Sequence, residues 1–328
     1  ITGITSYTGT ITLTTAASVS EMTTINTAIG STLGTYNLSD SSGNISAASS
    51  TILNNAGTIA ANHDGAGGNV FEFDNLTQTA TDSGASKPTA ITVTGDAGVD
   101  IVELSEAMTE SGRVTIALGD GDTQDDIVIF NTSDNTDWVT FNSSGTRTGG
   151  PSSFTFNKIQ NFEVGDSKDQ FGIFYGGSNG NGGDAVNFGA YQEITDLTAT
   201  NKLRDGITYE DNFNSGNGLS LTNAYVTNIA NIRAQIDEII TAGGTAGNSA
   251  GSSSLDFTYI LYAQSSSNSA QVSAYIYTGT YGQTNVAAGT AMTKDSLKIV
   301  GIAEIQNIVD EGFTNSFSTN KTGAGLAD

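Results

Sequence analysis

The sequence predicts a mainly β protein, built from β-solenoid (β-roll-like) or β-sandwich units with two short helices at about residues 18–29 and 226–241. Short runs of β-forming residues recur along the chain, and glycine and aspartate turns separate them. The 328 residues include 40 glycines but only 2 prolines and no cysteine, so disulfide bonds and thiolate metal sites are excluded. Charged residues make up only 14%, which excludes disorder driven by charge.

Residues 1–90 form the first predicted region, a repeat of strand, helix and strand. Residues 11–14 alternate as a strand does, and Ser18 and Glu21 have the spacing of a capping box at a helix N-terminus. Apolar residues at helical spacing continue this helix as far as Gly30. Residues 35–38 then predict a second strand, followed by a turn.

Residues 91–190 form the second region, a β region rich in glycine and aspartate. Strands are predicted at 90–93, 113–118, 126–130 and 154–156, and residues 176–190 read as a glycine/asparagine loop. This spacing is typical of a sandwich or a solenoid and does not fit an alternation of strands with helices.

The last two regions are residues 191–254 and 255–328. The first contains an apolar helical stripe over 226–241 and a Gly/Ser linker over 242–254. The second contains three strands, at 255–262, 272–277 and 296–300, and predicts a terminal β unit. Alternation places Tyr259 and Tyr262 on opposite faces of the first of these strands. We expect one face to be core and the other to be a subunit contact or, alternatively, a carbohydrate platform.

Four segments place glycines and an aspartate or asparagine directly before an apolar run: 64–71, 95–103, 121–128 and 179–186. Glycines allow a tight turn, and carboxylate oxygens are the hard ligands that Ca²⁺ prefers. The alternative is ordinary β-turn chemistry, which uses the same residues. The predicted metal ligands, with two from the segment 159–171, are Asn69, Asp96, Asp100, Asp122, Asp126, Asp166, Asp169 and Asp184.

These segments resemble the calcium-binding nonapeptide of RTX proteins, although they are not consecutive and some of their glycines are replaced. Residues 159–171 are similar to the segment that follows the calcium roll in RTX exoproteins. Residues 19–40 resemble a repeat of bacterial RTX-type surface proteins and adhesins, and residues 255–310 resemble the terminal β unit of proteins exported by type I secretion. The resemblance implies Ca²⁺ as the cofactor, a bacterial cell-surface location and an uncleaved C-terminal secretion signal.

The net charge excludes further classes of protein. Eleven basic residues against 34 acidic ones give −23, and so few cations cannot build a nucleic-acid-binding face. No apolar stretch approaches 18 residues, so no transmembrane segment is expected. The first residues lack the features of a signal peptide, which leaves three alternatives: removal of the peptide, a fragment, or another export route.

No enzyme motif stands in a suitable context. Two Gly-x-Ser-x-Gly matches, at 176–180 and 247–251, fall in low-complexity loops, whereas a nucleophile elbow needs a strand before the serine and a helix after it. The single histidine, His63, precedes both serines and has no partner motif for zinc. No pair among the many carboxylates is singled out for glycoside hydrolysis. The chain is therefore expected not to be an enzyme.

The function predicted from the sequence is that of a secreted structural protein that self-assembles with calcium into a cell-surface layer (S-layer), sheath or extracellular filament. Subunits at −23 repel one another, and bound divalent cations would neutralise that repulsion. The expected partners are further copies of the chain and cell-surface polysaccharide. The alternatives are a calcium-dependent adhesin or glycan-binding module, and a degenerate exoenzyme.

Overall fold

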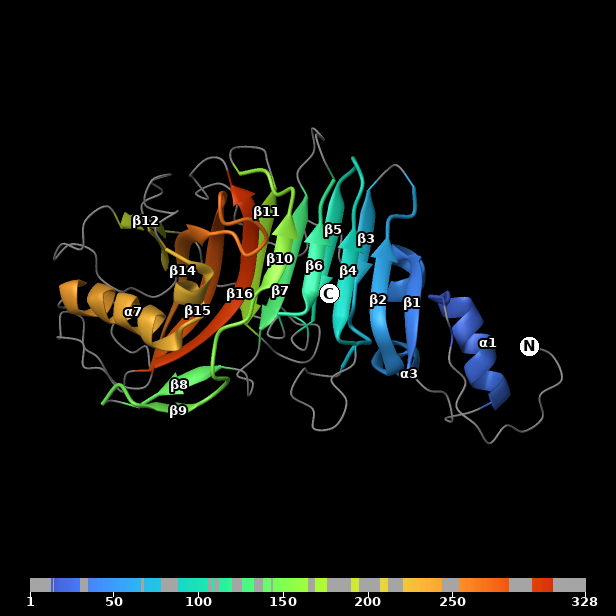
Figure 1. The fold of residues 1–328 in the computed structure, drawn as a ribbon, viewed down its shortest axis with the longest axis horizontal. Coiled ribbons are helices and arrows are strands. Elements are labelled where there is room, and N and C mark those ends of the chain that lie inside the picture. The colour runs from blue at the N-terminus through green and yellow to red at the C-terminus, as the bar shows by residue number, and fades with distance from the viewer. Residues whose placement is uncertain are drawn as a thin grey trace.

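The protein is mainly β with mixed sheets, as the computed structural model shows (Figure 1). The structure describes residues 13, 15–29, 35–65, 68–77, 88–105, 108, 112–119, 126–132, 138–142, 144–164, 169–175, 190–194, 207–211, 221–243, 254–282 and 297–308.

Two sheets build the part of the chain that the structure describes. Sheet A contains, in spatial order, β1 (Tyr36–Ser41), β2 (Ala56–Asn62), β4 (Ala90–Thr94), β6 (Val114–Ala117), β10 (Asn157–Gln160), β16 (Leu297–Ile308), β15 (Val272–Gly282), β14 (Ser254–Gln264), β13 (Ile207–Asp211) and β12 (Ala190–Ile194). Sheet B contains β11 (Gln170–Tyr175), β7 (Ile127–Thr132), β5 (Asp100–Leu104) and β3 (Asn69–Glu72). The hairpin of β8 (Val139–Phe141) and β9 (Arg147–Gly149) joins sheet A at β16.

From β2 to β7 the chain alternates between the two sheets, because each strand of sheet A is followed by one of sheet B. After the β8–β9 hairpin, β10 and β11 continue the alternation. All pairs in this part are parallel: β2 with β4, β4 with β6 and β6 with β10 in sheet A, and all three pairs of sheet B. Each pair of consecutive strands, for example β4 and β5, thus adds one strand to each sheet. We call one such pair a coil, and the stack of these pairs from β2 to β11 is the coiled part of the chain.

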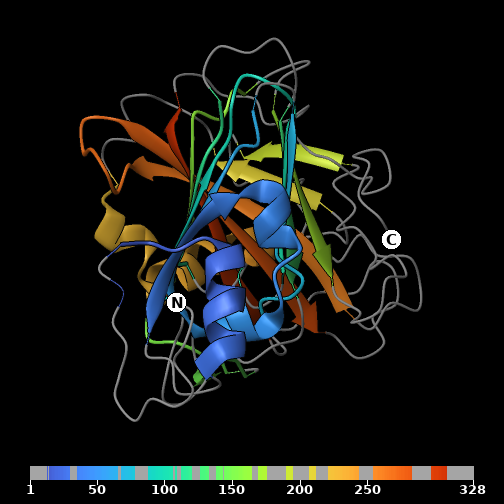
Figure 2. The ribbon, with the colours of Figure 1, turned by 90° about the vertical axis from the view of Figure 1, so that its right-hand side faces the viewer.

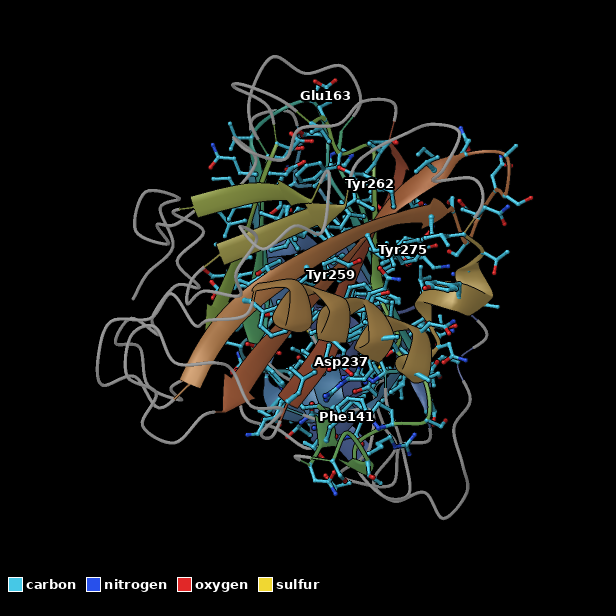
Figure 3. All side chains as sticks on the ribbon, turned by 90° about the vertical axis from the view of Figure 1, so that its left-hand side faces the viewer. Phe141, Glu163, Asp237, Tyr259, Tyr262 and Tyr275 are labelled. Carbon is cyan, nitrogen blue, oxygen red and sulfur yellow. The ribbon has the colours of Figure 1, made fainter. Side chains whose placement is uncertain are left out.

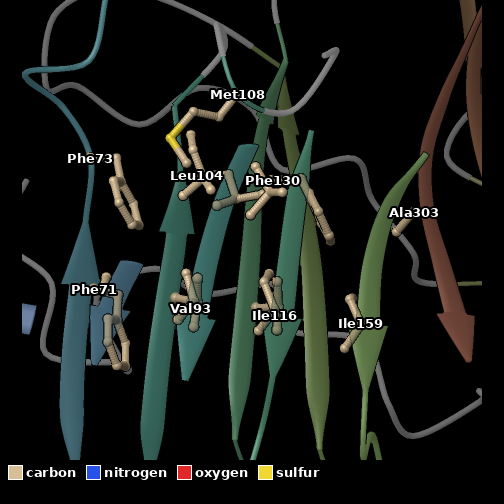
Figure 4. Packing of buried hydrophobic residues seen from close by; sticks show 14 of the residues in the cluster. Phe71, Phe73, Val93, Leu104, Met108, Ile116, Phe130, Ile159 and Ala303 are labelled. Atoms are coloured by element: carbon tan, nitrogen blue, oxygen red, sulfur yellow. The ribbon is translucent and has the colours of Figure 1, made fainter. Parts of the chain in front are cut away.

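The core lies between the two sheets (Figure 4). Val93 and Ile116 of sheet A and Leu104 and Phe130 of sheet B are all completely buried in one cluster. In β4 and β6 the residues alternate between buried and more exposed positions, as expected for strands with one face toward a core. The predicted strands at 90–93, 113–118 and 126–130 are confirmed as β4, β6 and β7.

The predicted strand at 154–156 is wrong, because β10 begins only at Asn157. The Phe154 N–H donates to the Thr227 carbonyl at 2.9 Å instead of joining a strand ladder. The rings of Phe154 and Phe156 each contact Tyr277 edge-to-face, with centroids 5.3 Å apart in both pairs. Ring packing therefore determines the course of this segment.

Helices lie at the N-terminal end of the coil, where α1 (Val19–Ile29) packs against β1 and α3 (Ser50–Asn55) (Figure 2). The predicted capping box is present, since the Ser18 N–H donates to Glu21 Oε2 at 2.9 Å and the Glu21 N–H to Ser18 Oγ at 3.2 Å. The short helices α2 (Ser42–Ser46), which packs against β3, and α3 were not predicted. The predicted strand at 35–38 is present as β1, and the one at 11–14 lies outside the described residues except for Leu13.

The C-terminal strands β14, β15 and β16 are long and antiparallel, and a helical segment lies across them (Figure 3). The predicted helix at 226–241 is present as α6 (Asn223–Val226) and α7 (Ile229–Gly243). Because β16 also pairs in parallel with β10, these strands belong to the same sheet as the coil. The division of the chain into four regions stays a prediction.

Both faces of β14 are covered, so the expectation of a carbohydrate platform or subunit contact on one of them is wrong. Tyr259 is 2% exposed and packs with Ile232 and Ile236 of α7 in one core cluster. Tyr262, also 2% exposed, points to the opposite face and joins the cluster between the sheets. The alternation of the two faces was predicted correctly, but the sequence did not show that α7 packs on one and the coil on the other.

Candidate functional site

Four asparagine and aspartate side chains line one edge of the coil. Asn69 and Asp100 begin β3 and β5, and Asp126 and Asp169 directly precede β7 and β11. Their exposed fractions are 5%, 0%, 1% and 3%. We call these residues the Asx ladder; each occupies the same place in successive coils, where the chain passes from sheet A to sheet B.

Hydrogen bonds connect the ladder from coil to coil. Asn69 Nδ2 donates to Asp100 Oδ1 at 2.8 Å, the Asp100 N–H donates to Asp126 Oδ1 at 2.8 Å, and the Asp126 N–H donates to Asp169 Oδ1 at 3.1 Å. Such bonds to buried carboxylates offset part of the cost of removing charge from water. The ladder therefore joins sheet-B strands through side chains as well as through the backbone.

A second set of bonds holds each preceding loop to its ladder residue. The N–H groups of Asp64, Asp96 and Glu163 each donate at 2.7 Å to a side-chain oxygen, those of Asn69 Oδ1, Asp100 Oδ2 and Asp169 Oδ2 respectively. The loops at this edge are therefore shaped by the ladder.

Two glycines at this edge allow a close approach, Gly119 to the neighbouring coil and Gly95 to a side chain of its own loop. A Cβ on Gly119 would collide with the backbone carbonyl of Asp96, and one on Gly95 would collide with the Asp100 carboxylate. Neither glycine has a positive φ, whereas Gly65 and Gly68 do, at 123° and 87°. Positive φ therefore explains glycine at 65 and 68 in the first loop, and close approach explains glycine at 95 and 119.

Burial raises the pKa of Asp100, while hydrogen bonds from Asn69 and from the Asp96 N–H lower it and the charge of Asp96 raises it further. The Asp64 carboxylate lies at the solvent-exposed start of the edge. Its pKa is lowered by hydrogen bonds from Ser41 and from the Gly43 N–H. The edge therefore contains carboxylates in very different environments.

Of the predicted ligands, Asn69, Asp100, Asp126 and Asp169 are brought together as the ladder. Asp96 lies beside it, and its Oδ2 is buried without a hydrogen-bond partner, 3.7 Å from His63 Nδ1.

The other predicted ligands, Asp122, Asp166 and Asp184, lie outside the described residues, as do both Gly-x-Ser-x-Gly segments. In the part of the chain that the structure describes, no group of three or more His, Asp or Glu side chains is arranged to hold a metal ion.

Sequence reasoning missed a further polar side chain, Asn157 at the start of β10. Its Oδ1 accepts from the Val114 N–H at 3.2 Å, and its Nδ2 donates to the Ile302 carbonyl at 3.2 Å. It therefore bridges β6 and β16 in sheet A, as the ladder residues bridge strands of sheet B. The sequence pattern around Asn157 is a weak signal, because an asparagine before a short alternating run also fits a simple turn.

Sequence reasoning also missed Glu304, a carboxylate that is 2% exposed in the middle of β16. Its Oε1 accepts from the Ser266 N–H at 2.7 Å and from Ser273 Oγ at 3.1 Å, and its Oε2 accepts from Ser266 Oγ at 2.6 Å. The Tyr275 hydroxyl contacts Oε1 at 3.2 Å. The carboxylate anchors the turn between β14 and β15, and the acid within the apolar run 297–308 is the signal that could have identified it.

The comparisons add no relative: no protein-family model, curated protein or solved structure matches this chain. Among the residues described, no helix has both the length and the apolar character needed to cross a membrane.

Proposed function

We propose that this chain is a secreted, non-enzymatic structural protein of the bacterial cell surface that assembles with Ca²⁺ into a layer, sheath or filament. In this proposal the alternating strands form an RTX-like β-roll, and the edge that carries the Asx ladder binds the ion. One observation carries the proposal: three of the four glycine/aspartate segments, and the segment 159–171, supply the ladder residues of this single edge.

The acidic residues of the connecting segments support calcium binding at this edge. The connection from β6 to β7 contains Asp120, Asp122 and Asp125 in sequence before the ladder residue Asp126. Gly119, which starts this segment, touches the Asp96 backbone, and Asp96 Oδ2 has no hydrogen-bond partner. Further carboxylates from the segment would complete the oxygen ligands that Ca²⁺ needs.

Charge gives the mechanism by which calcium would promote assembly. Each copy carries −23, so copies repel one another until cations neutralise the acidic edge. Contact between copies then needs a surface, and end strands of a sheet offer unpaired backbone groups. Among the described strands, β12 ends sheet A at the C-terminal side. Contact of one such end with a different surface of the next copy gives an open, head-to-tail assembly.

The glycan-binding alternative has less support. Both faces of the strand for which a platform was predicted are covered, one of them by α7, and Tyr259 and Tyr277 are buried beneath this helix. No described observation favours this alternative over the structural one.

Calorimetry and negative-stain microscopy with Ca²⁺ and with chelator test the proposal. The variant Asp96→Asn/Asp122→Asn removes two carboxylates without changing a ladder residue, and we expect it to need about tenfold more Ca²⁺ for binding and assembly. The matched control is Asp74→Asn, an exposed acid just after β3, at the opposite end of that strand. Absence of binding heat at about 1 mM Ca²⁺, or ordered arrays that form equally well in chelator, would contradict the proposal.

A further inference from the structure

The ends of the neighbouring strands β10 and β16 share one pattern, Ile-Gln-Asn followed by an apolar residue. Residues 159–162 read Ile-Gln-Asn-Phe, and residues 305–308 read Ile-Gln-Asn-Ile. The two strands are parallel, and Ile159 is paired with Ile305. Gln160 Nε2 donates to Gln306 Oε1 at 3.1 Å. The two strand ends therefore match in sequence and in register, and a hydrogen bond joins their glutamine side chains.

The two asparagines of this pattern share an uncommon backbone conformation. Asn161 and Asn307 both have φ of 62°, and they are the only non-glycine residues with positive φ in the described part of the chain. The left-handed region is costly for most side chains, and asparagine is one of the few that tolerate it. The backbone thus makes the same kind of corner at the end of each strand.

The sequence repeat continues beyond the corner. After Asn161 the chain crosses to sheet B, where Asp169 supplies a ladder residue and Phe171 is completely buried, at offsets of 169 − 161 = 8 and 171 − 161 = 10. The same offsets from Asn307 lead to Asn315 and Phe317, since 315 − 307 = 8 and 317 − 307 = 10. The first coil has the same pair of residues in Asn69 and Phe71, both buried.

Among the described strands of sheet B, β11 stands at one end of the sheet. In sheet A the strand β16 lies next to β10, whereas in sheet B the last described strand is β11, whose described neighbour is β7 alone. The Gln170 N–H donates toward β7, to the Asp126 carbonyl, at 2.8 Å. Because successive residues of a strand direct their backbone groups to opposite sides, the N–H groups of Phe171, Ile173 and Tyr175 point to the outer edge.

We propose that the outer edge of β11 is a strand-docking site and that its occupant is the chain's own segment around residues 315–317. In this arrangement Asn315 extends the Asx ladder beside Asp169, and Phe317 adds to the core beside Phe171. The segment is close enough, because β16 ends next to the corner from which the chain leaves β10. Residues 309–328 lie outside the described part of the chain. The inference depends on the alternation of strands and not on calcium.

Residue-resolved amide exchange of the full chain tests this docking, with Phe317→Ser compared with Phe313→Ser. Position 313 matches Ser167 of the first copy of the pattern, two residues before the ladder residue Asp169, because 313 − 307 and 167 − 161 both equal 6. We expect the outward-pointing amides of Phe171, Ile173 and Tyr175 to exchange about tenfold faster in Phe317→Ser. The amides of Gln170 and Gly172, which face β7, should change less, and Phe313→Ser should behave as the wild type does.

A second variant covers the case in which Phe317→Ser disturbs the whole fold. Asn315→Leu keeps a side chain of similar size but removes the ladder hydrogen bonds, and it should accelerate exchange at the same three amides. Wild-type exchange at these amides in both variants, or equal acceleration by Phe313→Ser, would overturn the proposal. Protection that disappears on dilution, together with a dimer in sedimentation, would also overturn it, because the occupant would then be a second copy.

Discussion

At the scale of single residues, buried polar side chains determine how successive coils stack. Asn69 donates through its amide to Asp100, whereas Asp100, Asp126 and Asp169 act as acceptors for N–H groups. An acid suits the later positions because a carboxylate offers two oxygens, one for the neighbouring coil and one for its own loop, as in Asp169. One carboxylate of the ladder thus binds both the neighbouring coil and its own loop.

The titration of Asp100 gives a prediction for its removal. Burial raises its folded pKa, so its contribution to the free energy of unfolding is present below the unfolded pKa and is lost as pH rises through the folded value. The wild type should therefore gain stability relative to Asp100→Asn as pH falls from about 7 to about 4. Urea unfolding across this range measures the difference. An Asp74→Asn control should show a smaller trend, because the charge of Asp74 only adds to the effect of burial on the pKa of Glu72. For Asp100→Asn, a gap that widens with rising pH would contradict the assignment.

The close contact at Gly119 gives a second prediction at this scale. A Cβ there would collide with the Asp96 carbonyl of the neighbouring coil, and backbone cannot move aside as a flexible side chain can. Gly119→Ala should lower the free energy of unfolding by about 1–3 kcal/mol, the usual cost of overpacking. Chemical denaturation measures this change. A variant as stable as the wild type would show that the two loops are farther apart than described.

The sequence identified the ladder residues but not their partners. Asn69, Asp100 and Asp126 were recognisable because a polar residue follows glycines and precedes an apolar run. Their hydrogen bonds join residues 26 to 43 positions apart, and these distances follow from coil lengths that no local pattern encodes. Glu304 was missed for a similar reason, since its partners lie in β15 and in the turn that precedes this strand.

At the scale of elements, local signals predicted the long helices well and the short ones not at all. The helix α1 begins at its capping box, and α7 follows an apolar stripe, so both were expected from spacing alone. The helices α2 and α3 have 5 and 6 residues and are composed largely of serine, asparagine and small residues. Packing of Ile45, Ile52 and Leu53 into the core stabilises them, because helices this short are unstable in isolation.

The capping box of α1 gives a prediction for this element. Ser18→Ala removes the acceptor for the Glu21 N–H and should cost about 1 kcal/mol of stability, the typical value for a lost N-cap. Thermal or urea unfolding measures the loss. The matched control is Ser20→Ala, an exposed serine in the same helix, which should be neutral or slightly stabilising. Equal losses in both variants would contradict a capping role for Ser18.

At the scale of the whole molecule, sheet A connects the coil with the C-terminal strands. β16 pairs with β10 on one side and with β15 on the other, and its side chains enter both core clusters. Separating neighbouring strands of this sheet would expose core residues on both sides of the break. The two halves should therefore unfold together.

The single tryptophan provides a test of this cooperativity. Trp138 is 2% exposed and precedes β8, which pairs with β16. Its side chain lies in the core cluster between the two sheets, so its fluorescence reports on the junction of the coil with the C-terminal strands. Far-UV circular dichroism reports on all strands. We expect both signals to give one urea transition with the same midpoint. Two separate midpoints would show that the coil and the C-terminal strands are independent units.

The place of β16 between β10 and β15 has a consequence for the order of events during synthesis. Gln160 meets its partner Gln306 only after another 146 residues have been made. Until then the neighbour of β10 is missing, and long-range pairing of this kind is slow to form. A nascent chain emerging from the ribosome should therefore stay incompletely folded until β16 has been released.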